Sequence, residues 1–154
     1  MATGLQAGQS SNGRYKVIRL LDAATATNSP PSGASAGVAT TALDTDHGAY
    51  FFAPSATLIV RSTAGSGTMT VTIRLWGYDS LAAVWVPLGP GADSTKGTVN
   101  DGAAIGETGT DTIRHAEIVD NWMDFDRLYP EITAIGGTAT AVTVELKVRV
   151  VGNN

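Results

Sequence analysis

The stretch Thr138–Gly152, TATAVTVELKVRVVG, alternates small or polar side chains with apolar ones almost without a break. Its apolar positions include Val142, Val144, Leu146, Val148 and Val150, and the positions between them are Thr143, Glu145, Lys147 and Arg149. A period of two is typical of a β-strand with one buried face and one face in water. No stretch of the chain signals chemistry with comparable strength, so the sequence favours a β-rich structural or binding module.

Shorter segments upstream of this stretch also have the length and composition of strands. They are Tyr15–Leu21, Ala49–Ala53, Thr57–Ser62, Thr68–Trp76, Val84–Leu88, Thr112–Val119 and Asp126–Ile135. The second and third of these are either two strands or one bent strand, because Pro54 between them interrupts strand pairing. Pro87 predicts that its strand lies at an edge or an end of a sheet, since proline cannot donate to a ladder.

Glycine-rich segments separate the predicted strands. Turns are predicted at Ala64–Gly67 and Gly136–Gly137, and a connection at Gly77–Ala83. Gly89–Gly109 offers little to bury and is predicted to be an excursion at one end of the fold. Pro130 predicts an irregularity within its strand. The chain has no convincing amphipathic helix and no internal repeat of fixed period.

About eight strands without a helix predict an all-β, single-domain β-sandwich. Within that class a jelly roll is favoured, because long loops between full-length strands suit its crossovers better than tight hairpins do. A chain of 154 residues has the size of one domain. We expect a flexible N-terminal arm at 1–14, the sandwich at 15–151 with a long low-complexity loop at 22–48, and a C-terminal tail at 152–154.

Composition excludes several classes of function. The formal net charge is -4, and the ten basic residues are scattered along the chain, so direct binding to nucleic acid is not expected. The absence of cysteine excludes disulfides, thiolate metal sites and a cysteine nucleophile. Met1–Gly13 lacks the pattern of a signal peptide, and no window approaches the roughly 18 apolar residues of a membrane span. We therefore expect a soluble protein that is made in the cytoplasm and does not bind membranes.

Motifs for catalysis and metal binding are weak. His47 and His115 are the only histidines, and no G-x-S-x-G elbow accompanies them, so nothing indicates a hydrolytic triad. Asp44, Asp46 and His47 resemble the start of a calcium loop, but the distal bidentate glutamate is missing and a turn is favoured. The sequence therefore predicts no catalytic residue, no metal site and no cofactor.

Four carboxylates lie within ten residues beside two aromatic side chains. They are Glu117, Asp120, Asp124 and Asp126, with Trp122 and Phe125 among them. Such a group could cleave a glycosidic bond if two carboxyl groups stood roughly 5–10 Å apart. The favoured interpretation is a solvated acidic loop that Trp122 and Phe125 anchor to the core or to a neighbouring subunit.

Aromatic residues are the other candidate binding group. Trp76, Tyr78, Trp85, Trp122 and Tyr129 could form a stacking platform for carbohydrate. Aromatic rings also dominate the cores of sandwiches and the centres of protein interfaces, where each buries a large area. Core or interface packing is therefore the favoured role of the set, and glycan binding the alternative.

Two stretches of the chain resemble a known class of protein. TVTIRLWGYDSLAAVWVPLG (Thr70–Gly89) and FDRLYPEITAIGGTATAVTVELKV (Phe125–Val148), with an Ala/Thr/Gly-rich leader and no cysteine, resemble head decoration proteins of tailed bacteriophages with β-sandwich or jelly-roll folds. This resemblance implies a non-enzymatic virion structural protein that stabilises a capsid by bridging its subunits.

The resemblance also implies partners and a place of action. The implied partner is the major capsid protein, the implied assembly is a homotrimer at local threefold positions, and the implied location is the capsid exterior after synthesis in the host cytoplasm. The alternative function is a carbohydrate-binding or receptor-binding module of a phage tail or fibre. A glycan hydrolase using Glu117, Asp120 or Asp124 is the third hypothesis.

Overall fold

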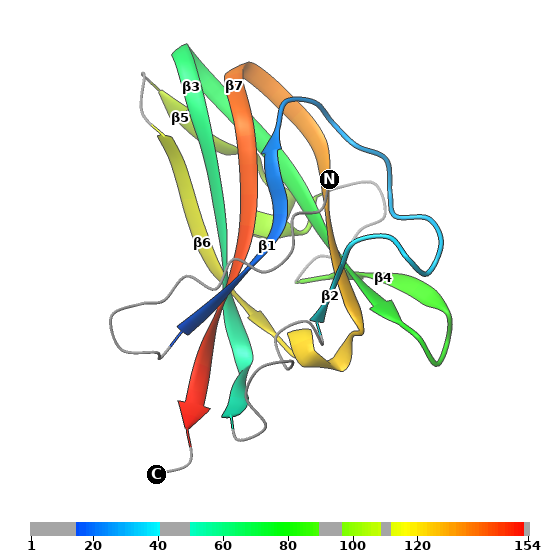
Figure 1. Ribbon diagram of the computed structural model, residues 1–154. Helices are drawn as coiled ribbons and strands as arrows, with labels where there is room; N and C mark the ends of the chain where they lie inside the picture. The colour runs from blue at the N-terminus through cyan, green and yellow to red at the C-terminus, as the bar shows by residue number, and fades with distance from the viewer. Residues whose placement is uncertain (1–14, 41–49, 90–96, 109–111, 153–154) are drawn as a thin grey trace.

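The computed structural model describes residues 15–40, 50–89, 97–108 and 112–152, and within them the chain is built mainly of strands (Figure 1). The elements are β1 (Tyr15–Ala24), β2 (Val38–Ala39), β3 (Tyr50–Asp79), β4 (Val84–Leu88), η2 (Val99–Gly102), β5 (Ile105–Thr108), β6 (Thr112–Asp120), η3 (Trp122–Asp124) and β7 (Arg127–Gly152), where η denotes a 3-10 helix. In this part of the chain no helix is long and apolar enough to cross a membrane. The expected arm at 1–14 lies outside the described residues.

Two exceptionally long strands, β3 and β7, organise the fold. They pair antiparallel along their whole lengths, from Tyr50 opposite Gly152 to Tyr78 opposite Arg127. β1 joins the C-terminal half of β7, and β6 joins the N-terminal half of β3. β2 joins the other half of β7, and β4 and β5 join the other half of β3. The result is two antiparallel layers packed together, with β3 and β7 shared between them.

Both long strands pass from one layer to the other at the same level, at the top of Figure 1. The predictions of strand-ending turns at Ala64–Gly67 and Gly136–Gly137 are wrong, because both segments lie inside continuous strands. Their pairing slips between Ala64 opposite Ala139 and Met69 opposite Gly137. Glycine-rich segments on two paired strands permit a joint bend with locally altered register, so the chain changes direction without ending either strand.

Other strand boundaries in the structure also differ from the predicted ones. The chain is one strand through Pro54, which confirms the single bent strand among the two alternatives. Gly77–Asp79 still belongs to β3, so the predicted connection shortens to the turn between β3 and β4. The register shift in the first half of β7 falls between Ile132 and Ala134, not at Pro130.

The predicted excursion Gly89–Gly109 is more structured than its composition indicated. It contains η2 and β5, which bring Val99 and Ile105 into the core. Thr98 donates its backbone N–H to Ile73 O and accepts a bond from Leu75 N–H through Oγ1. The described residues of this segment therefore pack against β3.

One continuous core lies between the layers, and alternate strand positions supply it. From one layer come Ile18, Leu20, Ala56, Leu58, Val60, Val119, Val142, Val144, Leu146 and Val148, and from the other come Val71, Ile73, Leu75, Ile105, Leu128 and Ile132. The predicted burial of Val142, Val144, Leu146 and Val148 in the last strand is thus confirmed, whereas Glu145, predicted to face water, is buried. The all-β sandwich is confirmed, and its assignment as a jelly roll stays a prediction.

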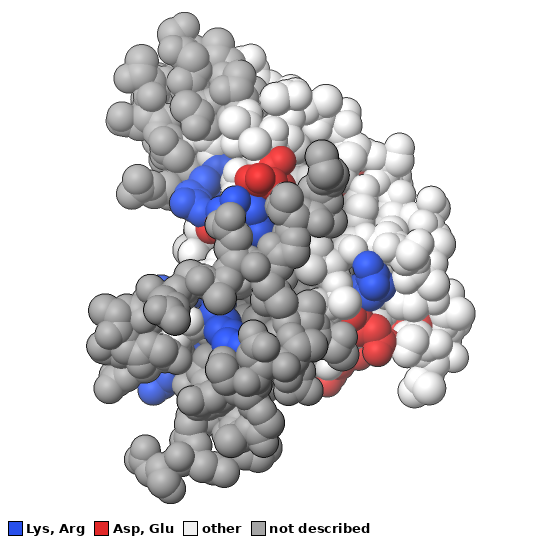
Figure 2. Space-filling view, viewed as in Figure 1, with Lys and Arg blue, Asp and Glu red and all other residues white. Residues whose placement is uncertain are grey.

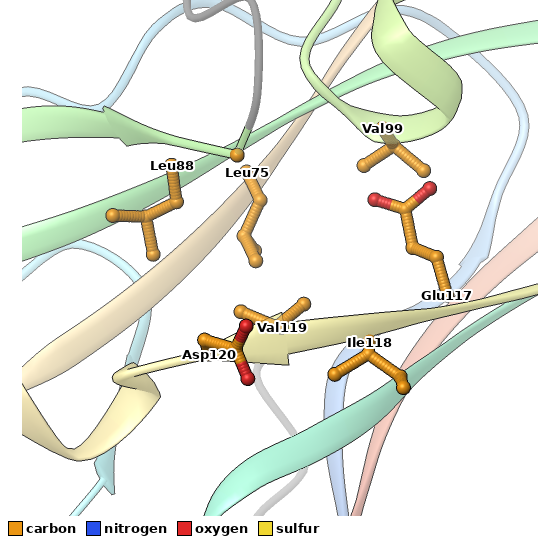
Figure 3. A pocket seen from close by; sticks show the side chains of 8 residues that line it. Leu75, Leu88, Val99, Glu117, Ile118, Val119 and Asp120 are labelled. Carbon is orange, nitrogen blue, oxygen red and sulfur yellow. The ribbon is translucent and has the colours of Figure 1, made fainter.

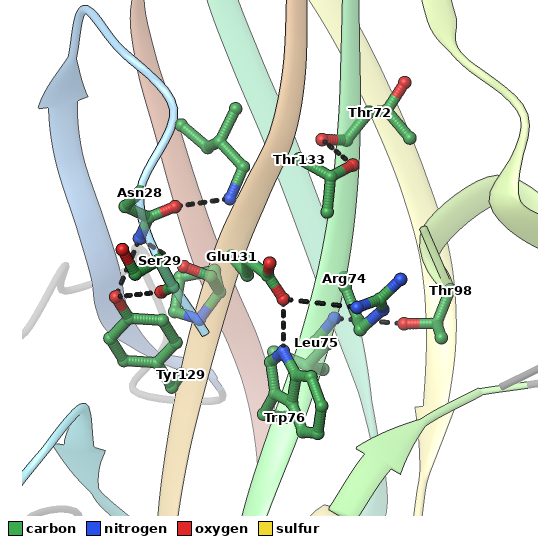
Figure 4. Close-up of polar contacts among 12 residues, drawn as sticks. Asn28, Ser29, Thr72, Arg74, Leu75, Trp76, Thr98, Tyr129, Glu131 and Thr133 are labelled. Atoms are coloured by element: carbon green, nitrogen blue, oxygen red, sulfur yellow. Dashed lines mark hydrogen bonds and ion pairs between the residues drawn. The ribbon is translucent and has the colours of Figure 1, made fainter. Parts of the chain in front are cut away.

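The described part of the predicted 22–48 loop lies along β7 and is held there by polar contacts (Figure 4). Asn28 donates from its backbone to Ile132 O and from Nδ2 to Pro130 O, and its Oδ1 accepts from Ile132 N–H. Further along, the Arg127 guanidinium donates to the carbonyl oxygens of Ser35, Ala36 and Gly37. The Asn28 bonds satisfy backbone groups of β7 between the segments that pair with β1 and β2, and the Arg127 bonds satisfy carbonyl groups of the loop.

Candidate functional site

A cavity of about 210 Å³ opens between the two layers along one edge of the sandwich (Figure 3). Its walls come from β3, β4, η2 and β6, namely Leu75, Leu88, Gly89, Val99, Glu117, Ile118, Val119 and Asp120. Most of these side chains are apolar, and the two carboxylates both come from β6. We call this region, together with the adjoining face of β4, the open edge.

Glu117 connects the two layers at the open edge. Its Oε2 accepts a hydrogen bond from Asn100 N–H at 2.7 Å and lies 2.8 Å from His115 Nε2. Asn100 has a left-handed backbone (φ 56°), so the carboxylate satisfies an amide that the short 3-10 helix leaves unpaired. Glu117 therefore fixes η2 against β6 as well as lining the cavity.

The four carboxylates that are close in sequence do not form one group. Glu117 and Asp120 line the cavity, but Figure 3 shows that their carboxyl groups do not point toward each other. Asp124 is exposed on η3, and Asp126 accepts from Ser80 N–H at the turn after β3. The expected anchoring of this acidic segment is confirmed, because Trp122 belongs to the core and the ring of Phe125 packs over Gly77.

The turn after β3 lowers the pKa of Asp126. Hydrogen bonds from the side chain and the backbone of Ser80 hold the pKa of Asp126 below the usual aspartate value. A lowered folded-state pKa gives a contribution to stability that is present above the unfolded pKa and is lost as the pH falls through the folded pKa.

We expect Ser80→Ala to raise the pKa of Asp126 toward the ordinary value. The variant removes the hydrogen bond from the Ser80 side chain, which lowers this pKa more than the backbone bond does. The backbone bond from residue 80 remains, so the pKa does not return completely. A carboxyl-carbon NMR titration measures this directly, with the exposed Asp124 as the internal reference. Identical Asp126 titration curves in the two proteins would contradict this account of the turn.

The five aromatic residues proposed as a carbohydrate platform separate into two groups. Trp122 is 1% exposed in the core. The other four lie on the outer face of the layer that contains β4, where Tyr78 and Trp85 are tilted at 46° and Trp85 meets Tyr129 edge-on at 67°. The rings of this cluster therefore do not form a flat array.

The indole groups of Trp76 and Trp85 and the phenol of Tyr129 have protein partners. Trp85 Nε1 donates to Gly33 O, and Tyr129 OH donates to Ser29 O. Trp76 Nε1 donates to the buried carboxylate of Glu131 (Figure 4). The cluster thus fastens the loop before β2 to the sheet, and tilted aromatic pairs of this kind add to stability.

Apolar side chains are exposed on β6 and on the β3–β4 hairpin. Leu81 is 99% exposed at the tip of the β3–β4 turn, and Ile118 on β6 is 72% exposed. Val84 and Val86 are exposed on the face of β4 that also carries Leu88, so an apolar row runs from the cavity toward the tip. We call Leu81, Val84, Val86 and Ile118 the apolar rim.

Charge is sparse and locally balanced over much of the visible surface in Figure 2, where acidic and basic atoms lie next to one another. Glu145, which the alternation places on the face in water, is largely buried because Arg19 and Arg61 both pair with it. The described residues contain no group of three or more His, Asp or Glu side chains that could hold a metal ion. The DTDHG segment considered for calcium lies outside the described residues.

Comparisons of the chain with protein-family models, curated proteins and solved structures find no match. The candidate site therefore rests on geometry alone. Sequence reasoning missed the cavity, since its walls come from four segments between Leu75 and Asp120 that only the fold brings together. The one signal that pointed to it was Pro87, which correctly predicted an edge position for β4.

Proposed function

We propose that this protein is a non-enzymatic structural component of a bacteriophage virion that binds the outside of the capsid and bridges its subunits. The observation that carries the proposal is the apolar rim beside the open edge. A chain whose core is already well filled still exposes Leu81 almost fully and Ile118 to 72%. Leu81, Val84 and Val86 come from one short hairpin, and exposed apolar side chains that lie close together are typical of protein-binding sites.

The chemistry of the open edge agrees with contact to another protein. Hydrophobic side chains supply most of the free energy of association, and charged residues are depleted at interface centres. Only 16% of the residues are charged, which lowers the cost of desolvating the surface.

The proposed partner is the major capsid protein, and the proposed assembly is a homotrimer at local threefold positions of the shell. Each subunit then presents one open edge, so three weak contacts act together through multivalency. A cyclic trimer closes by repeating one heterologous contact, which matches a sandwich whose two long edges differ. The stability that such a protein adds to the shell needs contact area and no catalytic group.

We expect Leu81→Asp combined with Ile118→Asp to weaken attachment to purified phage heads about tenfold or more, because both side chains leave water only in the complex. Co-sedimentation of the protein with heads at increasing concentration measures the effect. The matched control is Tyr15→Ser, which removes an exposed ring from β1. In the strand order of the sheet, β1 lies at the opposite end from β4.

Circular dichroism distinguishes loss of contact from loss of fold in these variants. Since both rim positions are exposed, the thermal unfolding curve of the double variant is expected to stay close to that of the wild type. Undiminished attachment of a folded double variant would exclude the apolar rim as the contact. The carbohydrate-binding alternative would be favoured instead if the wild-type protein did not bind heads but bound a glycan array, and if that binding required Trp85.

A further inference from the structure

We propose that Asp79 and Asp126 hold the β3–β4 turn in the shape that presents Leu81 to an apolar recess on the protein to which this chain attaches. The two aspartates are positioning residues, because they act through the turn and need not touch the partner. The inference rests on the proposed attachment function and specifies the shape and chemistry of the partner's surface. It is drawn from the hydrogen bonds of the turn and from the exposure of its side chains.

The turn joins two strands that are firmly paired at its base. Asp79 and Val84 form the last pair of the β3–β4 ladder, and residues 80–83 form the tip that lies beyond this pair. Next to it, the rings of Tyr78 and Trp85 meet with centroids 5.1 Å apart. Figure 1 shows the hairpin extending away from the body of the sandwich. The base therefore fixes where the tip lies, and the contacts of the tip itself decide its shape.

Carboxylates bind three backbone N–H groups of the tip. Asp79 Oδ1 accepts from Leu81 N–H at 2.9 Å and from Ala82 N–H at 3.2 Å. Asp126 Oδ2 accepts from Ser80 N–H at 3.0 Å, and the Ser80 side chain also binds this carboxylate. Aspartate at the start of a turn commonly binds the backbone in this way, and hydrogen bonds to ionised groups are stronger than neutral ones. These bonds fix the backbone at Leu81 and at both of its neighbours.

Asp126 is itself held against the base of the hairpin. Its backbone N–H donates to Tyr78 O at 2.9 Å, and the ring of the preceding Phe125 packs over Gly77. At the end of the tip, Ala83 has a φ of 55° in the left-handed region. A residue other than glycine adopts this region at a cost, so neighbouring contacts have to hold it there. The tip is thus held both from the end of β3 and from the segment before β7.

Leu81 is the side chain that this conformation presents. It is 99% exposed at the end of a convex turn, so only a concave surface can bury it. The next two residues are Ala82 and Ala83, whose small side chains allow a partner to approach closely. Val84, which is also exposed, continues the apolar surface. We therefore expect the partner to offer an apolar recess, since a charged group buried against leucine would lose its water without gaining a partner.

A fixed turn strengthens this contact without adding any atom to it. Ordering the backbone of a mobile loop on binding costs free energy for each residue, and this cost lowers the affinity. Here the hydrogen bonds to Asp79 and Asp126 order the tip before the partner arrives. Removal of these bonds is therefore expected to weaken attachment although the apolar contact surface is unchanged.

Backbone ¹⁵N relaxation of the full-length protein tests the order of the tip without phage heads. We expect order parameters of about 0.85 for residues 80–83 in the wild type, and below about 0.6 when Asp79→Ala and Asp126→Ala are combined. Asp79→Asn with Asp126→Asn keeps an oxygen acceptor at both positions and is expected to restore the order. The matched control is Asp124→Ala, which removes a nearby exposed carboxylate and is expected to leave the tip rigid. A tip that is mobile in the wild type, or rigid in the double alanine variant, would overturn the inference.

Co-sedimentation with purified phage heads connects this order to Leu81 through a double-mutant cycle. The double alanine variant and Leu81→Ala are each expected to weaken attachment about fivefold or more. Combining all three substitutions is expected to weaken attachment no further than Leu81→Ala alone, because the turn then has no leucine to position. Fully additive losses would overturn the inference, since the aspartates would then act independently of Leu81.

The two proposals fail in different ways. A tip that is rigid only with its aspartates, in a protein that does not bind heads, would support their positioning role and overturn the capsid as partner. Attachment that requires Leu81 but is unchanged in the double alanine variant would support the capsid and overturn this inference. Dissociation of the free protein's oligomer by Leu81→Ala would place the recess on a second copy and overturn the capsid as its source.

Discussion

Replacement of Glu131 by alanine is expected to lower the free energy of unfolding by about 3–5 kcal/mol, the usual loss when one partner of a buried ion pair is removed. Arg74 is 3% exposed and Glu131 is 6% exposed. Glu131 Oε2 lies 3.5 Å from Arg74 Nη1 and accepts the indole N–H of Trp76 at 2.7 Å (Figure 4). The alanine variant therefore withdraws a carboxylate from a buried guanidinium and leaves a half-buried indole N–H without its acceptor.

Denaturant unfolding of two further variants separates these contributions. Glu131→Gln retains an oxygen for Trp76 while it removes the charge, so its loss is expected to be smaller than that of the alanine variant. Asp124→Ala removes an exposed carboxylate and is expected to stay within about 0.5 kcal/mol of the wild type. A loss below about 1 kcal/mol for Glu131→Ala would contradict the structural importance of this buried group.

Trp122→Ala is expected to cost about 3–5 kcal/mol of unfolding free energy, because it deletes the largest fully buried side chain of the core. Trp122 begins η3, which follows β6 directly and covers one end of the sandwich. The adjacent Met123 is exposed, so Met123→Ala is the matched control and is expected to change stability by less than about 0.5 kcal/mol.

The Trp122 prediction also affects how the carbohydrate-binding alternative is tested. A loss of glycan binding in Trp122→Ala would report damage to the core and not loss of a stacking surface. Trp85 is half-buried on the outer face and is the better position for that test. A Trp122→Ala protein as stable as the wild type would show that the aromatic ring does not support the core.

The strands were predictable because their signal is local. The alternation of Val142, Val144, Leu146 and Val148 needs only the period of a strand and one buried face, and all four side chains are buried. The bend at Ala64–Gly67 was not predictable as such. Glycine and small residues permit a turn and a bend equally, and the difference depends on whether the paired strand bends at the same level.

The candidate site was less predictable than the fold. In the sequence, Glu117 and Asp120 lie close to Asp124 and Asp126. In the structure these four side chains are separated, because side chains alternate between the two faces of β6 and η3 begins after it. The cavity additionally needs Leu75 and Val99, which lie far away along the chain. Local patterns carry no information on which segments meet across the core, so neither the cavity nor the apolar rim follows from them.

The most direct test of the account is an electron cryo-microscopy reconstruction of phage heads after incubation with the purified protein. The account predicts trimeric density on the outer surface at local threefold positions, with β4 and β6 facing a neighbouring protein chain. The same heads incubated with the Leu81→Asp, Ile118→Asp double variant are predicted to show little added density. Bare heads at saturating concentrations of folded wild-type protein would contradict the account.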